Sequence, residues 1–336
     1  MESRIAPVGS SIEQRMVWMD TLRGAAILFV VLFHAAHVLR LAGLDIPVWI
    51  DAFNSFFGPF RMPMLMMLSG MLLARSLNKS TGIYLWGKLR LIAWPALVWT
   101  AIFGVTIGIK YEWWNPLFWV NSTYLWYLQA LLVYYLLALI VRRVPPWVLV
   151  LVPLCLSFFT HDSFGLHRLL FLMAFFFFGH AISAYRATFD KMIRSRWTWL
   201  LAIPPLLLAV ASAISEDPDG LRYVAPLWPV VAAGGIVSVK VATKFGRGIG
   251  VVGLQYVGRN SLIFYVVHRP LLVWLILPLH TWWNLPIPIH FAISVAIALL
   301  ACWGMVELAK RTPAKWLFEI PAFRRRKLKE ESLAAS

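Results

Sequence analysis

The chain has 336 residues, of which 60% are hydrophobic and only 14% charged, and its mean hydropathy is +0.73. With several apolar runs of 18 or more residues, this composition excludes an ordinary soluble domain and indicates a multi-pass membrane protein. The formal net charge of +16 is typical of nucleic-acid-binding proteins, but the basic residues lie in short loops between apolar runs, so we expect no nucleic-acid partner.

Ten apolar segments follow one another along the chain. They predict membrane spans at 16–40, 50–74, 88–109, 122–141, 147–160, 168–185, 198–214, 223–241, 255–279 and 287–309. We therefore predict an all-α integral membrane protein with a short N-terminal segment (1–15), one ten-helix membrane domain (16–309) and a basic tail (310–336).

The Lys and Arg residues alternate between the two sides of these spans. With the N-terminus placed in the cytoplasm, the inner segments hold 24 of the 31 basic residues and the outer segments hold 4. The other three, Arg23, Arg61 and Arg269, lie inside spans. Because positively charged loops stay on the cytoplasmic side, both termini are predicted to be cytoplasmic. We expect the protein to lie in the cell membrane, with the lipid bilayer as a partner.

The first span carries three ionisable residues, Asp20, Arg23 and His34. Eleven residues turn an α-helix by three turns plus about 20°, so Arg23 and His34 share one stripe, about 16 Å apart along the axis. Asp20 lies one turn before Arg23 and either pairs with it or takes part in chemistry. Charged groups inside a membrane normally face a partner or a watery cavity, so this stripe predicts the wall of a functional site.

The number of residues between a polar side chain and the end of its predicted span gives its depth below the membrane surface. The residues counted to the outer half are His34, Arg61, Gln129, His268 and Arg269. The residues counted to the inner side are Asp20, Arg23, Arg90 and Asn260. Arg61 and Arg269 lie several turns from either surface, where snorkelling fails. Acidic residues are scarce in the spans, so we expect both arginines to contact an anion or a substrate.

Several of these side chains have more than one interpretation. His268 is either a second catalytic group or an orienting partner. His37 lies one turn from His34, but no third ligand is evident and we expect no metal. The pair Ser69-Gly70 indicates close helix packing rather than a nucleophilic serine. The role of His180 stays open. The aromatic residues around Trp126 fit either the interfacial belt or an acceptor groove.

Four segments together resemble the membrane-bound acyltransferase-3 family. The first is Arg23 followed eleven residues later by His34, after Asp20. The others are Phe60-Arg-Met-Pro-Met-Leu-Met-Met-Leu-Ser-Gly70, Tyr124-Leu-Trp-Tyr-Leu128 and Gly258-Arg-Asn-Ser-Leu-Ile-Phe-Tyr-Val-Val-His268. They occur in the family's order over nearly the whole chain.

The resemblance implies transfer of an acyl group, usually acetyl or succinyl, from cytoplasmic acyl-CoA to an acceptor hydroxyl, often of a sugar or glycolipid on the outer side. It puts the family's essential histidine on His34 and its partner arginine on Arg23. We expect catalysis by His34, Arg61, His268 and Arg269. We expect donor binding, with acetyl-CoA as the donor, by Asp20, Arg23, Arg90 and Asn260. We expect acceptor binding by Trp126, Tyr127 and Gln129.

Some family members carry a fused extracellular domain that completes the transfer. We expect none in this chain, and we therefore expect the acceptor to be acylated in the membrane domain or by a separate extracellular partner enzyme.

A proton-coupled secondary transporter is the alternative, with His34 and Asp20 as a proton relay and the arginines binding an anionic or sugar-like solute. Repeated halves with matching broken helices, which many transporters have, are not evident in the sequence. Dependence on coenzyme A would distinguish the two functions. The acyl group, the acceptor and the oligomeric state stay open at this level.

Overall fold

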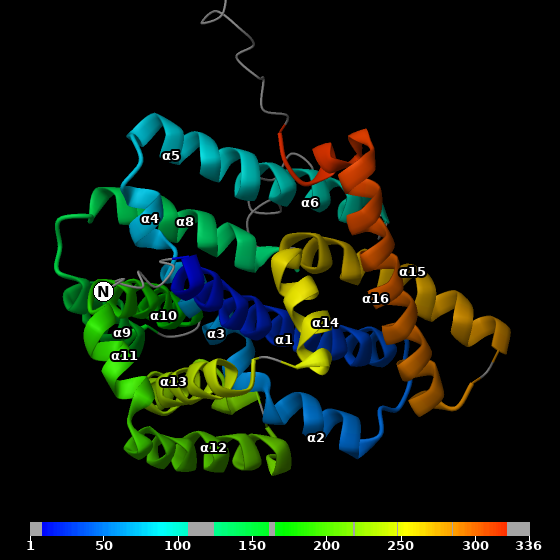
Figure 1. Cartoon of the computed structure of the whole chain (residues 1–336). Coiled ribbons are helices and arrows are strands. Elements are labelled where there is room, and N and C mark those ends of the chain that lie inside the picture. Colours follow the sequence, from blue (N-terminus) through cyan, green and yellow to red (C-terminus); the bar gives the residue numbers. More distant parts are fainter. Residues whose placement is uncertain are drawn as a thin grey trace, which may run out of the picture.

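The computed structural model describes residues 9–106, 124–160, 165–217, 219–246, 248–283 and 285–320. Within these ranges the chain is helical and contains no strand, which confirms the all-α fold class. The first eight residues and most of the predicted basic tail lie outside them. In Figure 1, α1 (Gly9–Leu41) runs through the middle of the bundle, and the later helices pack around it.

Seven helical segments are long and apolar enough to cross a membrane. They are Val17–Leu41, Val48–Leu77, Thr81–Thr106, Leu166–Ala184, Arg196–Ile214, Ala225–Phe245 and Ile287–Arg311. Three shorter apolar helices, Trp126–Ile140, Pro146–Phe159 and Ser261–Ile276, fall within the other predicted spans. A multi-pass membrane protein is therefore confirmed, while the exact number of spans and the side of each terminus stay predictions.

Several predicted spans consist of more than one helix. The third predicted span, 88–109, holds a π-helical turn (Leu89–Ala93) and α6 (Trp94–Thr106), and α5 (Thr81–Lys88) extends the same apolar segment before it. The fourth to sixth are α8 (Trp126–Ile140), α9 (Pro146–Phe159) and α10 (Leu166–Ala184), after which α11 (Arg186–Arg194) connects to the seventh. The seventh begins as a 3₁₀-helix (Arg196–Ala202) and continues as α12 (Ile203–Ile214). The eighth and tenth are α13 (Trp228–Phe245) and α16 (Ile287–Arg311).

The predicted second span, 50–74, lies within the apolar segment Val48–Leu77, which is long enough to cross a membrane but is not one straight helix. It is divided into α2 (Val48–Phe56), α3 (Gly58–Gly70) and α4 (Leu73–Leu77). Pro59 has no N–H to continue the hydrogen bonds of α2 and occupies the first turn of α3, where that N–H is not needed. As a result α2 packs against α12, at the bottom of the view in Figure 1, and Arg61 lies in the first turn of α3.

The predicted ninth span, 255–279, is likewise two helices, α14 (Ile249–Arg259) and α15 (Ser261–Trp283). The side-chain amide of Asn260 donates to the carbonyl of Tyr256 at 2.8 Å, and the Asn260 backbone leaves the helical region at ψ 21°. Such local side-chain bonds compete with the helical ladder. The break lets α14 pack along the N-terminal half of α1 while α15 packs between α1 and α16 (Figure 1).

Two helix crossings depend on glycine. A Cβ on Gly258 would lie 1.8 Å from the carbonyl oxygen of Asp20, where α14 crosses α1. A Cβ on Gly70 would lie 1.7 Å from the carbonyl oxygen of Phe176, where α3 crosses α10. The close packing expected at Gly70 is therefore present. Small residues let membrane helices approach closely enough for extensive van der Waals contact.

Candidate functional site

A polar cavity of about 720 Å³ opens at the end of the bundle where α8 and α10 begin, beside the second half of α1 and the first half of α15. This is the end predicted to be external. The polar cavity is lined by Val30, Phe33, His34, His37, Arg61, Met62, Tyr124, Trp126, Gly165, His167, Arg168, Asp219, Arg222, Tyr223, Tyr265 and Arg269. Three of the four predicted catalytic residues are on its wall.

His34 and His268 lie next to each other, with ring centroids 5.0 Å apart and planes at 87°. The Nδ1 atom of His34 is 3.0 Å from the carbonyl oxygen of Val30, and that of His268 is 2.9 Å from the carbonyl oxygen of Phe264. A carbonyl oxygen only accepts, so each Nδ1 carries the hydrogen and each neutral ring keeps a lone pair on Nε2. His34 faces the polar cavity, whereas His268 is fully buried behind it.

The guanidinium groups of Arg61 and Arg269 are held mainly by aromatic rings. The Cζ atom of Arg61 lies 4.2 Å from the Phe33 ring centroid, and its Nη1 donates to the carbonyl oxygen of Phe29 at 3.4 Å. The Cζ atom of Arg269 lies 5.9 Å from the Tyr124 ring centroid. Neither arginine forms an ion pair with a described acidic residue. Cation–π contacts of this kind position a charge and leave its N–H groups available to a ligand.

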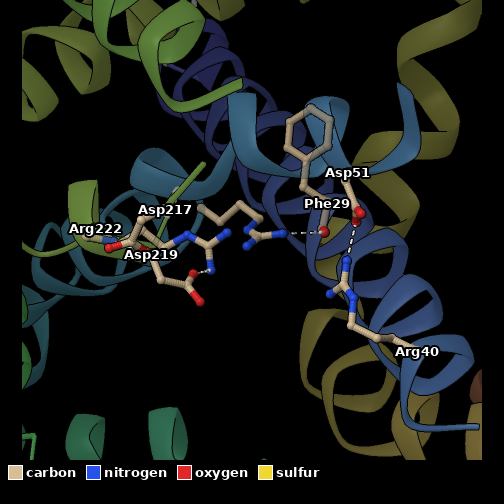
Figure 2. A network of polar contacts seen from close by, with 8 residues as sticks. Phe29, Arg40, Asp51, Asp217, Asp219 and Arg222 are labelled. Atoms are coloured by element: carbon tan, nitrogen blue, oxygen red, sulfur yellow. Dashed lines mark hydrogen bonds and ion pairs between the residues drawn. The ribbon is translucent and has the colours of Figure 1, made fainter. Parts of the chain in front are cut away.

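Sequence reasoning missed two arginines of the polar cavity, Arg168 and Arg222. Arg168 lies over the Trp126 ring, 4.3 Å from its centroid. Arg222 pairs with Asp219, as Figure 2 shows, and its guanidinium also lies near Phe33. Both belong to the four basic residues of the predicted outer segments, which at the level of the sequence serve only to predict topology. The signal was their position, because a basic residue in a predicted outer loop is an exception to the charge rule.

Two tyrosines form the wall of the polar cavity next to the histidines. The hydroxyl of Tyr124 on the α8 side donates to the carbonyl oxygen of Val266 on α15. In return, the hydroxyl of Tyr265 donates to the carbonyl oxygen of Tyr124 at 2.7 Å. These reciprocal bonds hold the start of α8 against α15 and so fix the ring of His268, which contacts both tyrosines edge-on or tilted.

Of the three predicted acceptor-binding residues, one lines the polar cavity and two do not. Trp126 lines the polar cavity, but Tyr127 and Gln129 do not. The hydroxyl of Tyr127 lies 3.2 Å from Ser69 Oγ and donates to the carbonyl oxygen of Leu65 at 3.3 Å. Tyr127 therefore belongs to a buried polar contact between α8 and α3, below the polar cavity.

The predicted donor-binding residues are also separated. Asp20 lies 3.8 Å from the Nε of Arg259 and interacts electrostatically with Arg23. Asn260 closes α14 beside this pair, since Gly258 contacts the backbone of Asp20. Arg90 instead pairs with Glu319 at 2.6 Å, in the π-helical turn before α6. The structure thus groups three of these four residues at the α1–α14 crossing and leaves Arg90 elsewhere.

The imidazole and guanidinium groups of the polar cavity determine which chemistry it can support. A neutral imidazole with a free Nε2 faces the polar cavity and can take a proton from a hydroxyl or attack a carbonyl carbon. Guanidinium groups beside it can stabilise a developing oxyanion. His37 also lines the polar cavity, stacked on Phe33 at 5.9 Å. Among the described residues, no group of three His, Cys, Asp or Glu side chains is arranged to hold a metal ion.

Comparison with known proteins gives one match. Residues 16–307 match the acyltransferase 3 family, described as an acyltransferase domain. No curated protein and no solved structure matches the chain. The match covers most of the chain and all the helices that build the polar cavity, and it gives no support to the transporter alternative. The chain therefore belongs to the acyltransferase 3 family of membrane acyltransferases.

Proposed function

We propose that this membrane acyltransferase transfers an acyl group, preferably acetyl, from a coenzyme A thioester to a hydroxyl of a cell-envelope glycan or glycolipid. The observation that supports this most directly is His34. Its ring is fixed by the Val30 carbonyl, its Nε2 has no hydrogen-bond partner among the described residues, and it faces a large polar cavity at the predicted outer end.

The donor approaches from the cytoplasmic side in this proposal. The predicted topology puts the α1–α14 crossing, with Asp20 and Arg23, on that side. The basic groups there favour the phosphates of coenzyme A. Arg23 and His34 are about 16 Å apart along α1, so the flexible arm of the donor spans the distance between them.

His34 acts as a general base or as an acyl carrier. As a base, its Nε2 takes the hydroxyl proton while the acceptor oxygen attacks the thioester carbonyl carbon. The C–S bond then breaks, and coenzyme A leaves as a thiolate that takes up a proton. A positioned base contributes about 10²–10⁴ in rate. As a carrier, Nε2 itself attacks the carbonyl carbon, the C–S bond breaks and coenzyme A leaves as a thiolate. In a second step the acceptor oxygen attacks the acyl-imidazole, the N–C bond breaks, and the hydroxyl proton passes to the thiolate or to solvent.

Arg61 and Arg269 are placed to stabilise the negative charge on the carbonyl oxygen in either route. Both line the polar cavity with His34, and neither is neutralised by a described carboxylate. His268 lies behind His34 and positions its ring by direct contact. The final transfer takes place in this cavity or on a separate extracellular partner enzyme.

The test is transfer of radiolabelled acetyl from acetyl-coenzyme A to envelope lipid and glycan extracts by the purified full chain. We would compare the wild type with His34→Ala and with the control His180→Ala. His180 lies in α10 and does not line the polar cavity. Equal monodisperse yield in detergent is required of all three proteins.

We expect label transfer by the wild type and by His180→Ala, and loss of at least about 10² in rate for His34→Ala. Full activity in His34→Ala would remove His34 from the chemistry. If no protein transfers acetyl, succinyl and longer thioesters are tested next, and their failure would refute the coenzyme A donor.

A further inference from the structure

The polar cavity has an excess of positive charge that the proposed chemistry does not require. Four of its described lining residues are arginines, Arg61, Arg168, Arg222 and Arg269, and one is an acid, Asp219. That acid is already paired with Arg222. Acetyl transfer to a neutral sugar calls for one or two cations near the oxyanion. The remaining charge favours an anionic substrate.

Unpaired N–H groups support the same conclusion. The Nε atoms of Arg168, Arg222 and Arg269 are buried and have no hydrogen-bond partner within the described part of the chain. Buried donors normally have an acceptor, and leaving one unpaired is costly. A phosphate or carboxylate offers several charged acceptor oxygens that match guanidinium geometry.

A second, apolar cavity of about 570 Å³ lies next to the polar one, between α1, α3, α12 and α13. Its volume is in the range of small-molecule sites, about 300–1,000 Å³. Its described lining side chains are apolar apart from Thr21, Ser238 and Arg61. The two hydroxyls donate to carbonyl oxygens of their own helices, Thr21 to Val17 and Ser238 to Gly234. The apolar cavity therefore suits a hydrocarbon chain.

Arg61 joins the two cavities, because its side chain lines both of them. It is only 6% exposed, and among the described residues its guanidinium has one hydrogen bond, to Phe29, out of five possible donors. A ligand that occupies both cavities must pass this guanidinium. That ligand combines an acidic group with a hydrocarbon chain.

We propose that the acceptor is an anionic lipid. Its acidic group binds between Arg168 and Arg222, its hydrocarbon chain fills the apolar cavity, and Arg61 contacts the junction of the two. This inference rests on the proposed acyl transfer and specifies its acceptor. The acceptor hydroxyl then belongs to the headgroup, which the anion contacts hold beside His34.

The test is lipid binding by the full chain in neutral detergent, measured by native mass spectrometry without any donor. The probes are dioleoyl phosphatidylglycerol, which is anionic, dioleoyl phosphatidylcholine, which is zwitterionic with the same chains, and glycerol phosphate, which has no chain. The anion site is removed in the double variant Arg168→Gln/Arg222→Gln. Its matched control is Arg40→Gln, since Arg40 pairs with Asp51 at the same end of α1 and does not line the polar cavity (Figure 2).

The apolar cavity is filled in Val237→Trp, which enlarges a half-buried lining residue of α13. Its control is Leu207→Trp, an exposed position of α12 that does not line the apolar cavity. We expect the wild type to prefer phosphatidylglycerol over phosphatidylcholine by at least about tenfold in Kd. The arginine double variant should lose this preference, and Val237→Trp should lose phosphatidylglycerol binding, while both controls behave as the wild type.

Equal binding of the two lipids by the wild type would overturn the proposal, as would an unchanged preference in the double variant. Glycerol phosphate binding as tightly as phosphatidylglycerol would overturn the role of the apolar cavity. The wild-type comparison needs no variant, so it decides the question even if a variant does not fold. Because no donor is present, a preserved preference in a protein that transfers no label supports the lipid site and counts only against the proposed transfer.

Discussion

Replacing Gly258 by alanine tests the crossing on which the position of α1 depends. The added Cβ would lie 1.8 Å from the carbonyl oxygen of Asp20 and 2.6 Å from its carbonyl carbon. The closest ordinary carbon–oxygen contacts are about 3.3 Å. Both obstructing atoms belong to backbone, so no side-chain rotation relieves the clash, and α14 and α1 must separate by about 1.5 Å.

The expected cost is that of overpacking a well-packed interface, about 1–3 kcal/mol. Alanine also has a higher helix propensity than glycine, which offsets about 0.5–1 kcal/mol in any helical position. Gly253 provides the matched control, because it lies on the same helix and a Cβ there would meet nothing within 4 Å. Gly253→Ala therefore gains the propensity without the clash.

Thermal unfolding of both variants in the same detergent measures the difference. We expect Gly258→Ala to be less stable than Gly253→Ala by about 1–3 kcal/mol, with a correspondingly lower Tm. Acyl transfer should fall as well, because a displacement of about 1 Å in a catalytic group costs up to about 10² in rate. Equal Tm values for the two variants would refute the argument that this crossing is at backbone contact.

Three further predictions use contacts elsewhere in the bundle. Lys240→Met removes two hydrogen bonds of 2.7 Å from the ammonium to the carbonyl oxygens of Ile193 and Ser195 at the C-terminal end of α11. We therefore expect at least about 1.5 kcal/mol lower stability by thermal unfolding, whereas Lys244→Met, at an exposed position, should change little. Tyr84→Phe removes the 2.7 Å bond to the Tyr135 carbonyl and should cost about 0.5–1.5 kcal/mol in the same assay; an unchanged Tm would show that this bond contributes nothing. Arg61→Gln should lower the transfer rate by about 10²–10³, and wild-type kcat in this variant would remove Arg61 from oxyanion stabilisation.

The helices themselves could be predicted from hydropathy, but their breaks could not. Apolar segments of membrane length are visible in the sequence, and each of them is mainly helical in the part that the structure describes. The breaks at Phe57 and Asn260 come from missing or competing hydrogen bonds, which leave the hydropathy of the segment unchanged. Only the local chemistry of Pro59 and of the Asn260 amide indicates them.

The sequence predicts how deep each polar residue lies along its helix, but only partly which way its side chain points. His34, Arg61 and Arg269 share the polar cavity because charged groups at that depth must face the bundle interior. Tyr127 lies beside Trp126 in the chain, but consecutive residues of a helix point about 100° apart, so only one of them faces the polar cavity. Depth along an axis does not determine rotation about it, which depends on the packing of neighbouring helices.

Helix α1 connects Asp20 to His34 without a break. The helix runs from Gly9 to Leu41. Its first half packs closely against α14 at Gly258, and its second half packs against α15. A continuous helix moves as a rod, so a displacement of Asp20 also shifts His34, about four turns further along the helix. In the proposed function, donor binding beside Asp20 would therefore change the alignment of the His34 imidazole, with the contact between Gly258 and α1 as the pivot.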